Sequence, residues 1–329
     1  MRPSLRKFTF KRMTVLVVSM MLCASSFSQH LIIGGQKFKV EAGLNFGPTF
    51  FLGDLGGNAG KGTRFIKDVN LELTKMMKGA FVTVYPTDWM GIRVAGQLTY
   101  VSGRDYAINS SGIHETWRKQ RNLDFRSNMW EVYGAVELYP TIMFRKYEDY
   151  DPRLKPYGFV GVGLFHFNPE GSLTDGNGTT TWYKLQPLRT EGQGMTQYPD
   201  RKPYKLTQLN IPMGFGIKYD LSEKVTIGTE LLYRHTFTDY IDDVSTNYID
   251  PVYFSQYLSP QDAAIARKIH DKMFGIITPN VSRYAPGTQR GNPKQNDAYF
   301  STLLKVGIKL GSNDVDRKAL RQTKCPFLY

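Results

Sequence analysis

Histidine next to hydroxyl and carboxylate groups is the feature of this sequence best suited to acid–base chemistry. The five histidines are His30, His114, His166, His235 and His270. His235 adjoins Thr236 and stands four residues before Asp239, so it is the best candidate for a general base. Its position also falls on the apolar phase of its segment, where an aromatic-belt role is as natural, and no nucleophile stands at a fitting spacing. We therefore assign no catalytic residues and do not expect an enzyme.

Metal binding is the second chemistry to consider. The run DYIDD at 239–243 offers carboxylates of the kind that Ca²⁺ prefers. It lacks the glycine and the ligand spacing of an EF-hand loop, so we expect solvated or capping carboxylates there. Of the two cysteines, Cys23 lies in the leader and Cys325 near the end, which leaves the mature chain without a disulfide or a cysteine metal site. We predict no metal and no cofactor.

A third group of charges recurs on one phase of segments that alternate between apolar and polar residues. This group forms the predicted interior charge network, and its members are Glu41, Arg93, Glu131, Glu137, Lys218, Glu230, Arg234, Lys305 and Lys309. Charges placed inside a closed sheet must pair, because an uncompensated buried charge is costly.

The elements that would position these charges are strands. Alternation with a period of two predicts eight of them, at about 38–51, 78–86, 89–101, 126–140, 156–168, 206–219, 224–237 and 298–310. The segment at 78–86 is short and ambiguous. The others are longer than the five or six residues usual in soluble sheets, and they match the roughly 9–11 residues that a tilted membrane-spanning strand needs.

The connections between the segments alternate strictly between short or medium and long. Short or medium ones follow the second, fourth and sixth segments, and long polar loops follow the first, third, fifth and seventh. This pattern is typical of bacterial outer-membrane barrels, with short periplasmic turns, long outer loops and an even strand count. We predict an all-β, eight-stranded antiparallel transmembrane barrel in the outer membrane, in contact with its lipid and with both termini periplasmic. Its lumen should be filled by side chains, since eight strands leave little more room.

The N-terminus has the order of a secretory signal peptide. Residues 1–13 are basic, residues 14–24 are apolar, and small residues follow. We place the signal peptide at 1–28, the barrel at 29–310 and a periplasmic tail at 311–329. A lipoprotein site at Cys23 is the alternative, but Leu22 precedes it where a small residue is needed.

Bulk composition excludes other classes. Mean hydropathy is −0.36, and no apolar run beyond the leader is long enough for a membrane helix. The formal net charge of +13 suits an anionic lipid or an acidic partner. No RNP-like, helix-turn-helix or zinc-finger pattern accompanies it, so we predict no nucleic-acid partner.

Basic residues in the medium turn and in the tail are the candidate contacts with a periplasmic partner. They are Arg145, Lys146, Arg153, Lys155, Arg317, Lys318, Arg321 and Lys324. The alternative for the tail is disorder. Residues 259–274 predict a helix that folds the last loop against the barrel, with Ser259 as its cap, Pro260 in its first position and Asp262 completing the capping box. A partner surface is the alternative for this helix.

Four stretches resemble one known family. They are FGPTFFLGDLGG at 46–57, RNLDFRS at 121–127, WYKLQPLRTEGQG at 182–194 and RHTFTDYIDDVSTNYID at 234–250. They look like the outer-membrane barrels typified by PorG of the type IX secretion system, over roughly 38–310. The resemblance implies an outer-membrane anchor for a periplasmic ring of a lipoprotein and its partner subunit, and it supplies no catalytic residues. A lipid- or glycan-modifying barrel enzyme, and a passive porin or adhesin, remain the alternatives.

Overall fold

A computed structural model of the chain describes residues 32–33, 36–37, 39–55, 73–107, 113–144, 152–273 and 285–310. Its main body is a closed antiparallel sheet of eight strands. They are β3 (Lys39–Leu52), β4 (Lys75–Thr87), β5 (Met90–Arg104), β6 (Asp124–Leu138), β7 (Leu154–His166), β10 (Thr207–Asp220), β11 (Val225–Thr236) and β12 (Ala298–Leu310). The eight predicted strands are confirmed, and the ambiguous second one is a regular strand of 13 residues.

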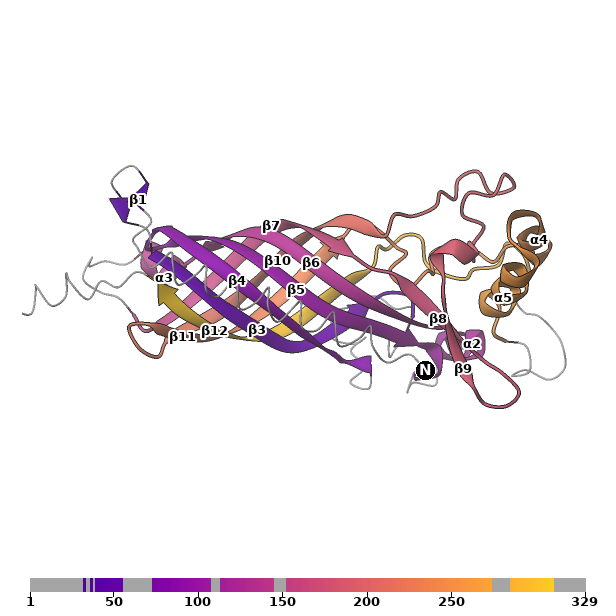
Figure 1. Cartoon of the computed structure of the whole chain (residues 1–329), viewed down its shortest axis with the longest axis horizontal. Helices are drawn as coiled ribbons and strands as arrows, with labels where there is room; N and C mark the ends of the chain where they lie inside the picture. The colour runs from indigo at the N-terminus through magenta and orange to yellow at the C-terminus, as the bar shows by residue number, and fades with distance from the viewer. Residues whose placement is uncertain are drawn as a thin grey trace, which may run out of the picture.

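The barrel closes because its first and last strands pair. β12 lies antiparallel to β3, with Leu310 opposite Val40 and Ala298 opposite Leu52. Every other neighbour in the barrel follows the chain order, from β3 through β4, β5, β6, β7, β10 and β11 to β12 (Figure 1). The eight strands therefore form a ring without a free edge strand, as a sheet that spans lipid requires.

The connections divide the barrel into two unlike ends. At the end that we call the turn end, short connections join β4 to β5 and β10 to β11, and the helix α3 (Pro140–Met143) follows β6. The four long connections, at 53–74, 105–123, 167–206 and 237–297, all leave and rejoin the barrel at the opposite loop end. The predicted alternation of short and long connections is confirmed. The small pair β1 (Ile32–Ile33) and β2 (Gln36–Lys37) lies near the turn end.

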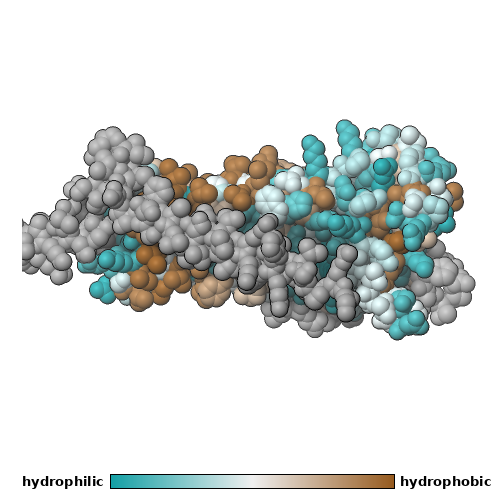
Figure 2. Space-filling view, viewed as in Figure 1, coloured by the Kyte–Doolittle hydropathy of each residue, from teal (hydrophilic) through white to brown (hydrophobic). Residues whose placement is uncertain are grey.

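Side chains alternate between the inside and the outside of the wall. In β6 the exposed residues Trp130, Val132, Val136 and Leu138 point outward. The residues between them, including Glu131 and Glu137, are buried in the lumen. Figure 2 shows the resulting apolar surface over the barrel wall, and polar side chains over the loop end. Apolar outside and polar inside is the arrangement of a transmembrane barrel.

The long connections build a folded structure that we call the loop cap, comprising the described residues of 53–55, 105–123, 167–206 and 237–297. It contains the hairpin β8 (Pro169–Thr174) and β9 (Thr180–Lys184), and the helices α2 (Ile113–Arg121), α4 (Phe254–Tyr257) and α5 (Pro260–His270). Single helical turns occur at η2 (Asp105–Ala107), η3 (Gln186–Leu188) and η4 (Pro251–Tyr253). None of the helices in the described segments is long and apolar enough to cross a membrane.

The loop cap has its own apolar core, in which Phe125 and Phe165 at the end of the barrel meet Phe254 and Ile269 of the cap. The predicted helix at 259–274 is confirmed as the shorter α5. The Asp262 amide donates to the Ser259 hydroxyl at 3.1 Å, and Pro260 occupies the first position. The β8–β9 hairpin, which extends the sheet from β6, was not predicted.

Candidate functional site

Arg93 of β5 stands at the centre of the lumen. Its side chain is fully buried and makes ion pairs with both Glu137 of β6 and Glu230 of β11. The Nη2–Oε2 distance to Glu230 is 2.8 Å. One guanidinium therefore connects opposite parts of the wall, and its five donors suit a site with two carboxylates.

Lys305 of β12 completes this middle layer. Its Nζ lies 3.1 Å from Glu230 Oε2 and 4.3 Å from the centre of the Phe81 ring. The hydroxyl of Tyr157 donates to the same Glu230 oxygen at 2.6 Å. The carboxylate thus receives hydrogen bonds from three directions, which is what allows it to remain in so dry a place.

A second layer lies toward the loop end. Arg234 donates to Glu131 at 3.1 Å, to Gln97 at 2.5 Å and to Ser301 at 2.7 Å. Asn210 donates to the other oxygen of Glu131 at 2.6 Å. These contacts join five different strands across the lumen.

A third layer closes the turn end. Lys218 pairs with Glu41 at 2.7 Å, and Glu41 also accepts from Thr226 and Tyr85, each at 2.6 Å. With the other layers this gives four buried glutamates, Glu41, Glu131, Glu137 and Glu230, and four buried cations, Arg93, Lys218, Arg234 and Lys305. The structure brings these eight predicted residues together as ion pairs, and their buried side chains lie in the lumen at each layer.

The ninth predicted member, Lys309, lies elsewhere. Its Nζ pairs with Asp220 Oδ1 at 2.8 Å, near the last residues of β12 and β10, and its side chain is partly exposed. Lys309 is therefore a rim residue rather than a lumen residue. Its alternation phase, which it shares with Lys305, predicts an inward position, but phase does not show how deep in the barrel a residue lies.

Asp220 also forms an ion pair with Lys155, one of the candidate partner contacts. Lys155 Nζ lies 2.9 Å from Asp220 Oδ2, so this lysine belongs to a largely buried ion pair and is not an exposed contact. Arg153 is exposed at the turn end, as a contact requires. Arg145, Lys146, Arg317, Lys318, Arg321 and Lys324 lie outside the described residues, as do the predicted signal peptide and tail.

The loop cap carries a second charge network, centred on Glu191. Arg290 Nη1 lies 2.8 Å from Glu191 Oε1, and the same guanidinium donates to the carbonyl oxygen of Asp243 at 2.7 Å. Glu191 also accepts from the amides of Ser245 at 3.0 Å and Thr246 at 2.9 Å. One buried ion pair thus ties together loop segments that lie about fifty and a hundred residues apart.

Four aspartates near this network are unlike the lumen glutamates. Burial raises the pKa of Asp54, Asp239, Asp242 and Asp297, and the charges of neighbouring acids raise each further, Glu191 for Asp54 and other aspartates for the remaining three. The pKa of Asp239 is raised to about 9, chiefly by burial. Asp242 accepts from the amides of Leu55 and Val244, each at 3.0 Å, so its oxygens serve the backbone.

The run at 239–243 therefore holds loops in place, as predicted, but its residues are buried rather than solvated. Burial raises the pKa of Asp243 to about 6, even though the Tyr204 hydroxyl donates to it at 2.7 Å. Among the described residues, no group of three histidine, cysteine, aspartate or glutamate side chains is arranged to hold a metal ion.

The candidate base His235 points outward at the end of β11, opposite Ile211 of β10. Its ring meets the Phe237 ring edge to face, with 5.3 Å between the centres. This is the belt-like surrounding that the apolar phase of His235 indicated.

The buried histidine of the cap is His270, whose ring nitrogens lie 2.7 Å from the Thr190 carbonyl oxygen and 3.2 Å from that of Ile249. Burial lowers its pKa to about 3. This ring is therefore neutral, and its single N–H donates to one of the two carbonyl oxygens while the other nitrogen only packs beside the second.

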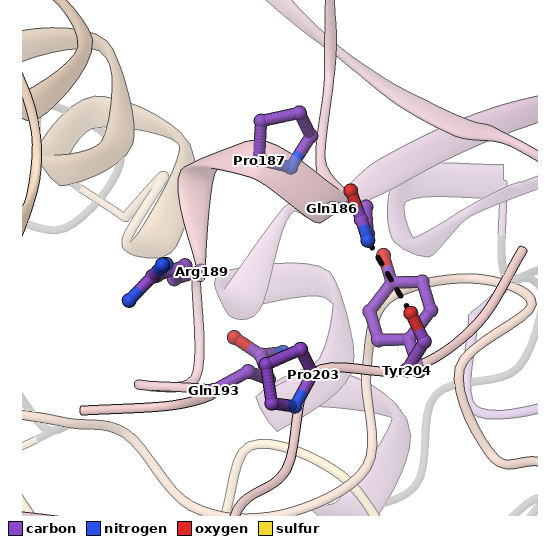
Figure 3. A pocket seen from close by; sticks show the side chains of 6 residues that line it. All are labelled: Gln186, Pro187, Arg189, Gln193, Pro203 and Tyr204. Atoms are coloured by element: carbon purple, nitrogen blue, oxygen red, sulfur yellow. Dashed lines mark hydrogen bonds between the residues drawn. The ribbon is translucent and has the colours of Figure 1, made fainter. Parts of the chain in front are cut away.

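A small cavity of about 260 Å³ opens in the loop cap. It is lined by Gln186, Pro187, Arg189, Gln193, Pro203 and Tyr204 (Figure 3). The side-chain amide of Gln186 donates to the Tyr204 carbonyl oxygen at 3.3 Å, so part of the polar lining of the cavity already has a hydrogen-bond partner. These residues include no acid and no histidine, so the cavity offers no general base.

Comparison with known proteins adds little to this geometry. No protein-family profile matches the chain, and no curated protein is similar to it in sequence. Solved structures that resemble it include the outer membrane protein OprG from Pseudomonas aeruginosa, with 10% identity over 83% of this chain and 96% of that one at a TM-score of 0.34. A major outer membrane protein from Thermus thermophilus has 9% identity over 83% of this chain and 100% of that one, at a TM-score of 0.33.

A third resemblance is to Ail, the attachment invasion locus protein of Yersinia pestis, with 8% identity over 82% of this chain and 99% of that one, at a TM-score of 0.31. At TM-scores this low, the fold described above rests on the strand pairing of this chain itself.

Proposed function

We propose that this chain is a non-conducting, non-enzymatic barrel of a bacterial outer membrane, whose turn end faces the periplasm. The observation that carries the proposal is the combination of an apolar outer wall with a lumen in which four buried glutamates meet four buried cations. An open pore would keep its charges wet, whereas here salt bridges and tyrosine hydroxyls occupy the interior.

We propose further that the barrel is a structural component of a type IX-like secretion machine that anchors periplasmic ring subunits, a lipoprotein and its partner. The sequence resemblance over 38–310 supports this role, and so does the exposed Arg153 at the turn end. A filled barrel has no lumen for transport, so its working surfaces are its two ends.

Conductance tests the first proposal. The purified barrel inserted into a planar bilayer should give no unitary current steps. Regular steps of uniform size would contradict a filled lumen. Insertion itself is checked by the shift in electrophoretic mobility between heated and unheated samples, which reports a folded barrel.

Recovery of partners tests the second proposal. Mild detergent extracts of the native cells, passed over a tagged barrel, should yield periplasmic ring subunits, and R153E should reduce their yield. Lys205, exposed in the loop cap at the other end, provides the matched control as K205E. Recovery of no ring subunit by an intact barrel would count against the anchoring role.

The loop cap favours a second candidate function, that of a passive surface barrel or adhesin. Its folded hairpin, helices and cavity form a defined outer surface rather than loose loops. Deletion of 175–179 at the tip of the β8–β9 hairpin should then lower cell attachment and leave secretion unchanged. Loss of secretion with normal attachment would favour the anchor. An unchanged lipid profile in H235A would support the absence of catalysis.

A further inference from the structure

One charged side chain stands on the outer wall away from the strand ends. Lys78 of β4 is exposed and points outward, between Phe46 of β3 and Leu98 of β5, which lie directly opposite it in the sheet. Both neighbours are exposed apolar side chains, and so is Met76 two residues along the strand. A lysine in such a wall is costly at the centre of a membrane and nearly free of cost at its edges.

The height of Lys78 in the membrane decides whether the cost of its exposed charge is high or low. Nine residues separate it from Thr87 at the turn end of β4, which corresponds to about 20 Å along the membrane normal for a strand tilted by about 45°. The apolar band begins close to the turn end, where Ile92 and Leu138 are exposed. Since such a band is about 25 Å tall, the Lys78 backbone lies about 5 Å below its upper edge, from where a long lysine side chain can extend to the lipid headgroups.

Polar aromatic side chains lie on the same row of paired residues. Along the row of paired residues, Leu98 is opposite Trp130, and Trp130 is opposite His166. The Trp130 and His166 rings stack outside the barrel, with 5.6 Å between their centres. Rings with one apolar and one polar part gather at membrane interfaces.

No protein group within the described chain neutralises Lys78, which makes no hydrogen bond or ion pair there. A second cation, Lys75, begins β4 three residues nearer the loop end. Its backbone position has the inward phase of Met77, but its Nζ stands 5.8 Å from the centre of the ring of Tyr100, which shares the outward phase of Leu98. By contrast, Arg126 on β6 already pairs with Glu170 at 2.8 Å. Lys78 and Lys75, both on β4, therefore have no carboxylate partner within the described residues.

We propose that the outer face of β4 and β5, next to the loop end, binds the phosphate of an anionic lipid headgroup. Lys78 is the principal contact and Lys75 the second. The exposed apolar residues Leu44, Val82 and Val94 receive the acyl chains of the same lipid, because they continue from the lysine toward the turn end. The inference rests on the membrane placement proposed above and is independent of any periplasmic partner.

Native mass spectrometry of the whole barrel in mixed micelles tests the proposal. Phosphatidylglycerol and phosphatidylcholine with identical acyl chains are the probes, since they differ in net charge at the headgroup. We expect the wild type to retain phosphatidylglycerol preferentially, and K78Q to bind it about fivefold more weakly, because each lysine near a charged lipid surface contributes about 1 kcal/mol. K78R should keep the preference, K75Q with K78Q should lower it further, and K205Q in the loop cap should leave it unchanged.

Three outcomes would overturn the proposal. K78Q could bind phosphatidylglycerol as tightly as the wild type, which would mean that Lys78 only extends toward water. Inorganic phosphate could compete as well as the lipid, which would indicate a simple anion site. Finally, a wild-type chain without a heat-dependent mobility shift would refute the membrane placement as well, so the two failures are distinguishable.

Discussion

The lumen and the loop cap are both closed by buried charges, yet they balance those charges differently. In the lumen each glutamate has a cation as a direct partner, for example Glu230 with Arg93 and Lys305. In the loop cap Glu191 has such a partner in Arg290, but Asp239, Asp242 and Asp297 mainly face one another and Asp54. The lumen is a balanced set of ion pairs, whereas the cap keeps carboxyl groups that are easier to bury when protonated.

This difference follows from geometry. Strands fixed by a ladder of backbone hydrogen bonds aim their side chains at set heights, so opposite charges can be matched layer by layer. Loops have no such ladder, and their amides need acceptors. Asp242 and Asp297 supply them, with Asp297 accepting from the Ile241 amide at 2.7 Å. In the cap, these aspartates therefore serve as acceptors for backbone amides, although no ion pair within the described residues balances their charge.

The sharpest test of the balanced lumen is R93M. The substitution removes the cation that Glu137 and Glu230 share, and the unpaired buried carboxylates should destabilise the barrel by about 5 kcal/mol. Urea unfolding in detergent, followed by tryptophan fluorescence and by the heat-dependent mobility shift, measures this loss. R153M at the exposed turn end is the control and should change little. A loss below about 1 kcal/mol would mean that water reaches Arg93.

R290M is the corresponding test in the loop cap. Glu191 would lose its ion pair but keep the amides of Ser245 and Thr246, so we expect a smaller effect of about 3 kcal/mol, confined to the cap. Hydrogen exchange should accelerate in 237–273 and remain slow in the strands. Global unfolding at lower urea would contradict the separation of cap and lumen.

The unbalanced aspartates predict a pH response that the lumen should not share. Burial raises the pKa of Asp243 to about 6 and that of Asp239 to about 9. The folded cap therefore binds more protons than the unfolded cap, so its stability should fall as the pH rises from about 4 through these two values. Hydrogen exchange, corrected for intrinsic rates, should show faster cap opening at pH 8 than at pH 5.

D239N removes the larger of the two titrations and should flatten the profile above pH 6. S245A is its control, because it removes the hydroxyl that contacts Asp239 and leaves the carboxyl group. A cap that opens at the same corrected rate at pH 5 and pH 8 would contradict the raised pKa values.

S259A should have the smallest effect. It removes the hydroxyl that accepts from the Asp262 amide at the start of α5, which should cost about 1 kcal/mol locally. Exchange of the first α5 amides reports it, and S259D should restore protection. An effect on barrel unfolding would show that α5 is coupled to the lumen after all.

The period of two was enough to predict the barrel, because each strand repeats the same alternation and phase alone separates wall from lumen. Glu131 and Glu137 could be placed inside from the sequence for that reason. Tyr157 could not, because its strand is apolar or glycine on both faces. One of the glycines that interrupt the alternation, Gly163, is required by close packing, because a methyl group there would come within 2.4 Å of Asn210 Oδ1.

The loop cap was hardly predictable. Its decisive pair, Glu191 and Arg290, joins two long connections, and no periodicity links residues so far apart in the chain. The β8–β9 hairpin has a local signal in Asp175 and Gly178, a turn in which the Gly178 amide donates to the Asp175 carbonyl oxygen at 3.0 Å. Only α5, with its capping residues, had a signal strong enough to be predicted in advance.

The pairing of β3 with β12 has a consequence for the order of the chain itself. Val40 and Leu310 lie opposite each other at the turn end, so a short linker could fuse these two places and new ends could be opened at 221–224. Such a circular permutant keeps every strand neighbour while changing which strand is synthesised first. Geometrically the wall is a ring, and the place where the polypeptide starts is incidental to it.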